Sequence, residues 1–321
     1  MIWLTWRQFR AQAIVAALAF VGLGLVLGYT GPHLVHLYHA SGITTCQATP
    51  NGDCGPLIDD FTSHYPLLHS LGALIILIPG VIGVFWGAPL LARELETGTH
   101  RVAWTQSVTR TRWLTTKVVM LGVVSVVTTA AFSVIIALWS SPLDRVSGNR
   151  FSPGTFSQRG IVPLAYATFA FALGVAAGAL IRRMLPAMAA TLGGFAAVRF
   201  VIQQWIRPHF AAAQHLTGPL FGADAAVKSG TWIVTSRAVN AAGKTVAFRR
   251  DTLRSLCRLP EGEFQRSALQ ACAQRLGIHR ILTVQPANRY WPFQIWETAV
   301  FVLLAAGLIT FAFWWTLSRI K

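Results

Sequence analysis

Six apolar runs, each long enough to cross a bilayer as a helix, constrain this chain of 321 residues more than any other feature. A hydrocarbon core of about 30 Å requires about 20 mostly apolar residues. Only 12% of the residues are charged, which is too few to cover a soluble protein of this size. We therefore exclude a soluble enzyme and predict an all-α integral membrane protein. The predicted transmembrane helices are residues 12–31, 67–92, 113–139, 161–181, 185–205 and 294–316.

The distribution of basic residues predicts the orientation of these helices. If the N-terminus is cytoplasmic, the inner segments carry 11 Lys and Arg and the two shorter outer loops carry three. The positive-inside rule therefore places both termini in the cytoplasm. Residues 1–11 combine Arg7 and Arg10 with aromatic side chains, which predicts a short helix in the membrane interface. The placement of the basic residues thus explains the net charge of +16 by membrane orientation, and we expect no nucleic-acid partner.

Residues 206–291 form a long outer segment with the composition of a soluble domain. Alternating stretches such as TWIVTSRAV and KTVAF, followed by helical patterns, predict a small extracellular α+β cap between helices five and six. All four cysteines fall in segments predicted to lie outside, where disulfides persist. The simplest pairing is local, although four cysteines allow three connectivities. The local pairs are Cys46 with Cys54 and Cys257 with Cys272.

The sequence offers no convincing catalytic or metal-binding motif. Gly243-Lys244-Thr245 resembles the end of a phosphate-binding loop, but Ala238 stands where that loop requires glycine. The histidine pairs lack cysteine or carboxylate partners at the spacing of metal ligands. We therefore expect no enzymatic activity, no metal and no cofactor in this chain.

The loop between the second and third predicted helices, residues 93–113, is the most informative segment for function. The second helix continues into water through acidic residues, and Gly98 can end it because glycine adopts the left-handed conformation at little cost. Thr99 can then cap a short helix whose apolar side chains dock on another protein. The alternative is a merely solvated, charged turn, against which its two glutamates argue. The docking residues that we predict are Arg93, Glu94, Glu96, Gly98, Thr99, Val102, Trp104, Val108 and Arg110.

At this loop the chain resembles the permease subunit of type-2 ATP-binding-cassette (ABC) exporters, a six-span class that moves lipids, glycans, drugs and antibiotics. That family has an RExExGT-like turn, which residues 93–99 match, and then a coupling helix that sits in a groove of a separate ATPase subunit. Residues 106–110 resemble the coupling region, with Ser107 where many relatives have proline. The resemblance implies a homodimer of permeases with two ATPase subunits, which bind ATP and Mg.

Polar residues inside the predicted helices are candidates for the substrate path. A charge near the bilayer centre costs about 3 kcal/mol, so it is expected to face protein or a wet cavity. Arg199, with Gln203 one turn later, lies in the fifth helix, and Glu297 lies in the last. Three readings stay open: an ion pair between Arg199 and Glu297, a substrate-contacting role for Arg199, or snorkelling to the interface. Gly83 and Gly87 in the second helix permit close helix approach or a bend.

The sequence thus predicts four parts: residues 1–11, residues 12–205 with the coupling loop, the cap at 206–291, and residues 292–321 with the last helix and a cytoplasmic tail. As a function we predict outward transport of an amphipathic or hydrophobic substrate, such as a drug, antibiotic, lipid or peptide, by alternating access. High Ala, Gly and Arg content with few Lys indicates a GC-rich bacterium, and we expect the chain to lie in the bacterial plasma membrane. The alternative function is a membrane receptor or immunity protein that binds a ligand through its cap without transport.

Overall fold

The chain divides into two compact units. The computed structural model describes residues 2–48, 54, 57–58, 60–61, 77–99, 109–141, 151–221, 227, 229–246, 257 and 266–319. The first unit comprises Met1–Ser147, Gly154–Gln203 and Gln294–Lys321, and the second comprises Gly148–Pro153 and Gln204–Phe293.

Six helices in the described part of the chain are long and apolar enough to span a membrane, which confirms the predicted number. Each contains or overlaps one of the predicted apolar runs. Residues 67–76, at the start of the second predicted run, lie outside the described residues. The six candidate spans are Ala13–Ala40, Leu77–Thr97, Arg110–Trp139, Val162–Ile181, Met184–His209 and Ala287–Arg319.

The first span is longer than predicted, because α1 (Ile2–Ala40) continues through Pro32 to Ala40. Proline removes one backbone hydrogen bond and favours a helix end, so the sequence indicated a boundary at residue 31. Leu34 and Tyr38, which are buried against Ile43 and Phe61, instead hold the extension in helical form. The helix also runs without a break through residues 2–11.

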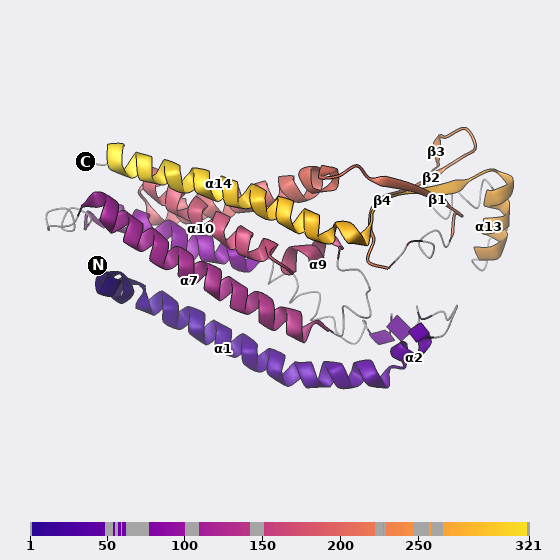
Figure 1. Ribbon diagram of the computed structural model, residues 1–321, viewed down its shortest axis with the longest axis horizontal. Helices are drawn as coiled ribbons and strands as arrows, with labels where there is room; N and C mark the ends of the chain where they lie inside the picture. The colour runs from indigo at the N-terminus through magenta and orange to yellow at the C-terminus, as the bar shows by residue number, and fades with distance from the viewer. Residues whose placement is uncertain are drawn as a thin grey trace. The chain divides into compact units, whose positions relative to one another are not determined.

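The helical unit is organised around α10 (Val162–Ile181), which packs against η1 (Gly83–Gly87), α5 (Ala88–Thr97), α7 (Arg110–Trp139) and α11 (Met184–Val201). Helix α7 also contacts α1, so it lies between α1 and α10 (Figure 1). The further helical elements are α2 (Ile43–Ala48), α9 (Pro153–Gln158), η2 (Ile202–Ile206), η3 (Arg207–His209), η5 (Ala287–Arg289) and α14 (Tyr290–Arg319).

Glycines bring the second span and α10 into backbone contact. The sequence analysis expected either close helix approach or a bend at Gly83 and Gly87, and the structure shows close approach. A Cβ atom on Gly83 would lie 2.4 Å from the carbonyl oxygen of Ala170, and one on Gly174 would lie 2.4 Å from the carbonyl oxygen of Gly83. Side chains at these positions would therefore separate the two helices. Residues 83–87 form a single π-helical turn, a deviation that is frequent at functional sites.

The second unit contains a small antiparallel sheet. Its strands are β1 (Gln214–Gly218), β2 (Trp232–Val239), β3 (Thr245–Val246) and β4 (His279–Gln285), in the order β1-β4-β2-β3. They lie in sequence between the fifth and sixth candidate spans. Leu269 and Ala273 of α13 (Arg266–Arg275) pack with Ala238 of β2 in a common apolar cluster. The alternating stretches of the sequence correspond to β2 and β3, whereas β1 and β4 were not predicted.

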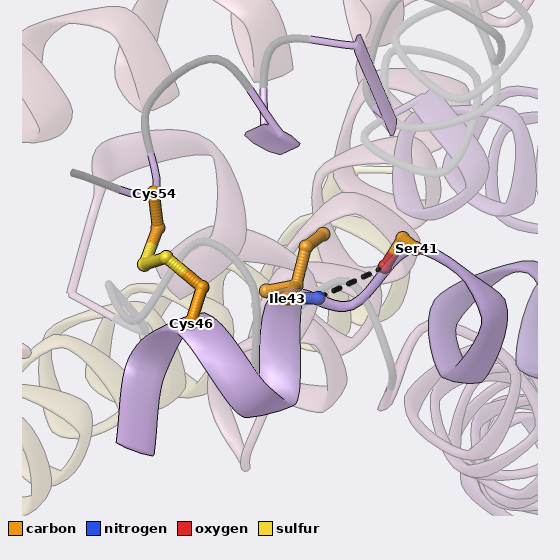
Figure 2. Close-up of a disulfide and its surroundings, with 4 residues drawn as sticks. All are labelled: Ser41, Ile43, Cys46 and Cys54. Carbon is orange, nitrogen blue, oxygen red and sulfur yellow. Dashed lines mark hydrogen bonds between the residues drawn. A yellow bond between two sulfur atoms is a disulfide. The ribbon is translucent and has the colours of Figure 1, made fainter. Parts of the chain in front are cut away.

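Both disulfides in the structure are the local pairs predicted from the sequence, Cys46–Cys54 and Cys257–Cys272. Cys46 projects from α2 toward Cys54 (Figure 2). The start of α2 is held by the backbone N–H of Ile43, which donates a hydrogen bond of 3.4 Å to Ser41 Oγ (Figure 2).

Candidate functional site

The two ends of the predicted coupling loop are capped by the chain's own residues. Helix α5 ends at Gly98, whose φ of 71° is the left-handed value predicted for a glycine C-cap. After the loop, Thr109 caps α7, because its hydroxyl accepts a hydrogen bond of 3.3 Å from the backbone N–H of Arg112. Three of the predicted docking residues, Val102, Trp104 and Val108, lie outside the described residues.

Glu94 connects the end of α5 to the start of α7. Its carboxylate accepts a hydrogen bond from Lys117 Nζ in an ion pair, and both residues are buried. Lys117 Nζ also lies 4.9 Å from the centre of the Trp113 ring, a cation–π contact. Removing one partner of a buried ion pair is strongly destabilising. The stability of the contact between α5 and α7 therefore depends on both Glu94 and Lys117.

Glu96 connects the end of α5 to the start of α11. Its Oε2 accepts a hydrogen bond of 2.8 Å from the backbone N–H of Met184, the first residue of α11. The first N–H groups of a helix lack partners within it, and a carboxylate there also interacts favourably with the helix dipole. The preceding residue, Arg183, supplies no side-chain cap. Glu96 therefore provides the cap from a different span.

The remaining described members of the predicted docking set, Arg93, Thr99 and Arg110, are exposed. The loop site thus has two layers. Glu94 is buried and Glu96 binds the start of α11, whereas the docking role of the exposed residues stays a prediction. In the sequence analysis, Lys117 was only one of the 11 basic residues of the inner segments that set the orientation, and its pairing with Glu94 was not predicted. The available signal was that Glu94 and Lys117 flank the same loop near the ends of two consecutive spans.

A second cluster lies inside the helical unit, where Tyr166 contacts both charged residues predicted from the sequence. The Tyr166 hydroxyl donates a hydrogen bond to Glu297 Oε1. The guanidinium carbon of Arg199 lies 5.0 Å from the centre of the Tyr166 ring. All three residues are buried. The structure thus brings Arg199 and Glu297 to the same tyrosine, while the direct ion pair between them stays a prediction.

Gln203, the third predicted path residue, is half-buried in η2. Tyr166 was not predicted, although it is the one tyrosine in the apolar run 161–181. A small pocket beside Tyr166 is lined by residues of the second span, α7, α9 and α10, among them Pro79, Thr129, Ser133 and Gln158. Among the described residues, no group of three His, Cys, Asp or Glu side chains could hold a metal ion.

Gln294, one turn before Glu297, anchors the start of α14 to the start of α10. Its Oε1 accepts hydrogen bonds of 3.1 Å from the backbone N–H groups of Ile161 and Val162. Its Nε2 donates to the carbonyl oxygens of Phe156 and Arg159, each at 3.1 Å. These four bonds fix Glu297 relative to Tyr166, because each residue lies within about a turn of the anchored segment. No local pattern in the sequence indicated this anchor, because its two ends are more than 130 residues apart.

Residues 16–207 match the family model described as ABC-2 membrane transporter related. This range is more than half of the chain and contains the contacts of Glu94 and Glu96 as well as Tyr166, Arg199 and Gln203. Glu297 and most of the second unit lie outside it. Neither a curated protein nor a solved structure matches the chain.

Proposed function

Because the chain belongs to the ABC-2 membrane transporter related family, we propose that it is the membrane-spanning subunit of an ATP-driven exporter. As a membrane component of an ABC transporter, it works with an ABC ATPase in a bilayer. The proposed working unit contains two copies of this chain and two ATPase subunits, in a bacterial plasma membrane with both termini in the cytoplasm. ATP and Mg bind to the ATPases, so this chain needs no cofactor of its own.

The observation that carries the proposal is the pair of carboxylate contacts at the base of the loop. Glu94 joins α5 to α7 through Lys117, and Glu96 joins α5 to α11 through the backbone of Met184. A force applied to residues 100–108 therefore acts on three spans together. An exporter driven by a separate motor protein requires such a connection, whereas a solvated turn does not.

Alternating access would follow from tilting of the second and fifth spans. Each of these spans contains a π-helical turn, Gly83–Gly87 in the second and Ile202–Ile206 in the fifth. Such turns are a common cause of helix kinks. The two spans therefore have local irregularities at which a change of tilt could be accommodated.

The transport path that we propose passes Arg199, Gln203 and Glu297. These side chains place a few polar groups among predominantly apolar helices, which is the usual lining of a site for amphipathic molecules. Candidates are drugs, antibiotics, lipids or peptides, and we propose export as the direction. The residues of the second unit form the extracellular cap in this proposal, which agrees with its disulfide because such bonds persist in oxidising compartments.

Copurification tests the proposal against the alternative of a receptor or immunity protein. The tagged full-length chain, extracted in mild detergent from its own membrane, is expected to retain an ABC ATPase and to hydrolyse ATP. A receptor that binds its ligand through the cap would copurify without an ATPase, and this result would overturn the exporter proposal.

A charge reversal tests the coupling itself. Glu96→Lys places a positive charge at the positive end of the α11 dipole, so substrate-stimulated ATP hydrolysis in proteoliposomes is expected to fall at least tenfold. Lys244→Gln, an exposed change in the second unit, serves as the control and is expected to leave hydrolysis within twofold of the wild type. Normal stimulation of the Glu96→Lys variant would contradict the coupling role.

A further inference from the structure

Strand β1 is one of the two edges of the sheet in the second unit, and β3 is the other. Strand β1 pairs with β4 from Gln214↔Val284 to Gly218↔Arg280, and β4 separates it from β2. Within the described residues, the other side of β1 has no strand beside it. Residues 214–217 are exposed and Gly218 is half-buried. The row of backbone N–H and C=O groups on that side is therefore open to another strand.

The sequence of β1 lacks the features that usually protect an edge strand. Natural edges carry charged side chains, proline or a bulge, because these discourage pairing with other chains. Residues Gln214–Gly218 read QHLTG, with no Lys, Arg, Asp, Glu or Pro. The irregularity in the sheet lies between Ile233 and Thr235 of β2, away from this edge. Leu216 even exposes 39% of its surface there.

We propose that β1 pairs with β1 of a second copy of this chain, so that two sheets become one across a twofold axis. In an antiparallel arrangement centred on Leu216, His215 of each copy faces Thr217 of the other, and Gln214 faces Gly218. No pair of formal charges meets in this register, and a twofold interface uses the same surface from both subunits. The proposal rests on the proposed function, which requires two copies in the working unit.

A second copy suits this edge better than a strand from an unrelated protein. The segment 206–291 carries 12 Lys and Arg against four acidic residues. Another protein attracted by this charge would be acidic and would bind the basic side chains. The edge itself carries no formal charge and presents an apolar side chain at its centre. Self-pairing needs neither charge complementarity nor a further protein.

Disulfide trapping tests the pairing in the full-length protein in its membrane, with its ATPase present. Facing Cα atoms of antiparallel strands lie about 4.5 to 5.5 Å apart, within the range of roughly 4.4 to 6.8 Å that a disulfide spans. Among the described residues, the four native cysteines are all disulfide-bonded. Leu216→Cys is therefore expected to give, under mild oxidation, a band at twice the 35.0 kDa mass of the chain.

Leu276→Cys is the matched control, because Leu276 belongs to the same unit and exposes 45% of its surface, yet it follows α13 and is not part of β1. It is expected to give at most one tenth of the linked dimer. Equal linkage of both variants would indicate random collision and overturn the proposal, as would a Leu216→Cys band of another mass. The proposal also fails if neither Leu216→Cys nor the second pair of cysteine variants, at His215 and Thr217, gives a linked band.

A pair of different cysteine variants checks the register of the two strands. It also shows whether a negative result is caused by misfolding of one variant. Differently tagged copies carrying His215→Cys and Thr217→Cys are expected to link to each other when co-expressed. If wild-type copies copurify with each other and the ATPase but neither design links, only the edge pairing fails. If wild-type copies copurify with neither, the proposed function fails instead.

Discussion

Glu94 and Lys117 form a buried ion pair that joins the end of α5 to the first turns of α7. Glu94 precedes residues 100–108 in the sequence and Lys117 follows them. The ion pair therefore connects the helices on either side of the predicted coupling loop. Glu96 extends this connection to α11 through the backbone of Met184. The two carboxylates of the acidic turn thus make contacts inside the chain, one with a side chain of α7 and one with the backbone of α11.

Removing the charge of Glu94 is expected to destabilise the protein. Glu94→Gln leaves the Lys117 ammonium buried without its carboxylate, which typically costs about 3 to 5 kcal/mol. Denaturant unfolding of the purified protein in detergent measures the change. Arg10→Gln, an exposed change on α1, is the control and is expected to stay within about 0.5 kcal/mol of the wild type. Equal stabilities of the two variants would contradict the energetic importance of the pair.

A double substitution separates the structural from the mechanical role of this pair. Replacing a buried ion pair by apolar residues of similar size is often neutral or stabilising, so Glu94→Leu with Lys117→Met is expected to recover most of the lost stability. Its substrate-stimulated ATP hydrolysis is expected to remain below that of the wild type, because α5 and α7 are no longer joined by a directional contact. Full recovery of both properties would show that the pair serves only stability.

The cap on α11 predicts a smaller and salt-sensitive effect. Glu96→Ala removes the carboxylate that accepts from Met184 N–H, and a charge at an exposed helix terminus contributes about 0.3 to 1 kcal/mol at low ionic strength. The free energy of unfolding is expected to fall by that amount in low salt and by less in high salt, because exposed charges are screened. Glu96→Gln keeps an acceptor and is expected to lose less.

The spans could be predicted from the sequence because the length of an apolar run is a local property. Their ends could not, since α1 passes Pro32 through contacts of Leu34 and Tyr38 with residues later in the chain. The disulfide pairs could be predicted because the two cysteines of each pair are close in sequence. Strand β1 was missed because its five residues show no alternation and its partner β4 lies more than 60 residues away.

Only some residues of the candidate site could be predicted from the sequence, because their contacts join segments that are far apart along the chain. An arginine and a glutamate in apolar runs mark positions that need a partner, so Arg199 and Glu297 were found. Their common neighbour Tyr166 is 131 residues from Glu297, and no pattern along the chain indicates that distance. Lys117 was likewise visible as a charge but not as the partner of Glu94.

The hydroxyl of Tyr166 is expected to matter independently of its ring. Tyr166→Phe keeps the ring near Arg199 and its edge contact with Phe301, while Glu297 loses a hydrogen bond inside the protein. A hydrogen bond to a charged group typically contributes about 1.5 to 3 kcal/mol, so the free energy of unfolding is expected to fall by about that amount. Unfolding in detergent measures the loss. The comparison is Tyr38→Phe, because Tyr38 is also buried but its hydroxyl makes no hydrogen bond to a carboxylate within the described residues. Equal stabilities would argue against the Glu297 contact.

Backbone contact between the second span and α10 gives the sharpest test of the packing. A Cβ atom on Gly174 would lie 2.4 Å from the carbonyl oxygen of Gly83 and 2.6 Å from the backbone nitrogen of Ala88. Gly174→Ala must therefore push the helices apart, and overpacking of this kind typically costs about 1 to 3 kcal/mol. Gly193 of α11 has no atom within 4 Å of the same position. Gly193→Ala is expected to stabilise the protein by up to about 1 kcal/mol through helix propensity, so unfolding measurements on the two alanine variants should change in opposite directions.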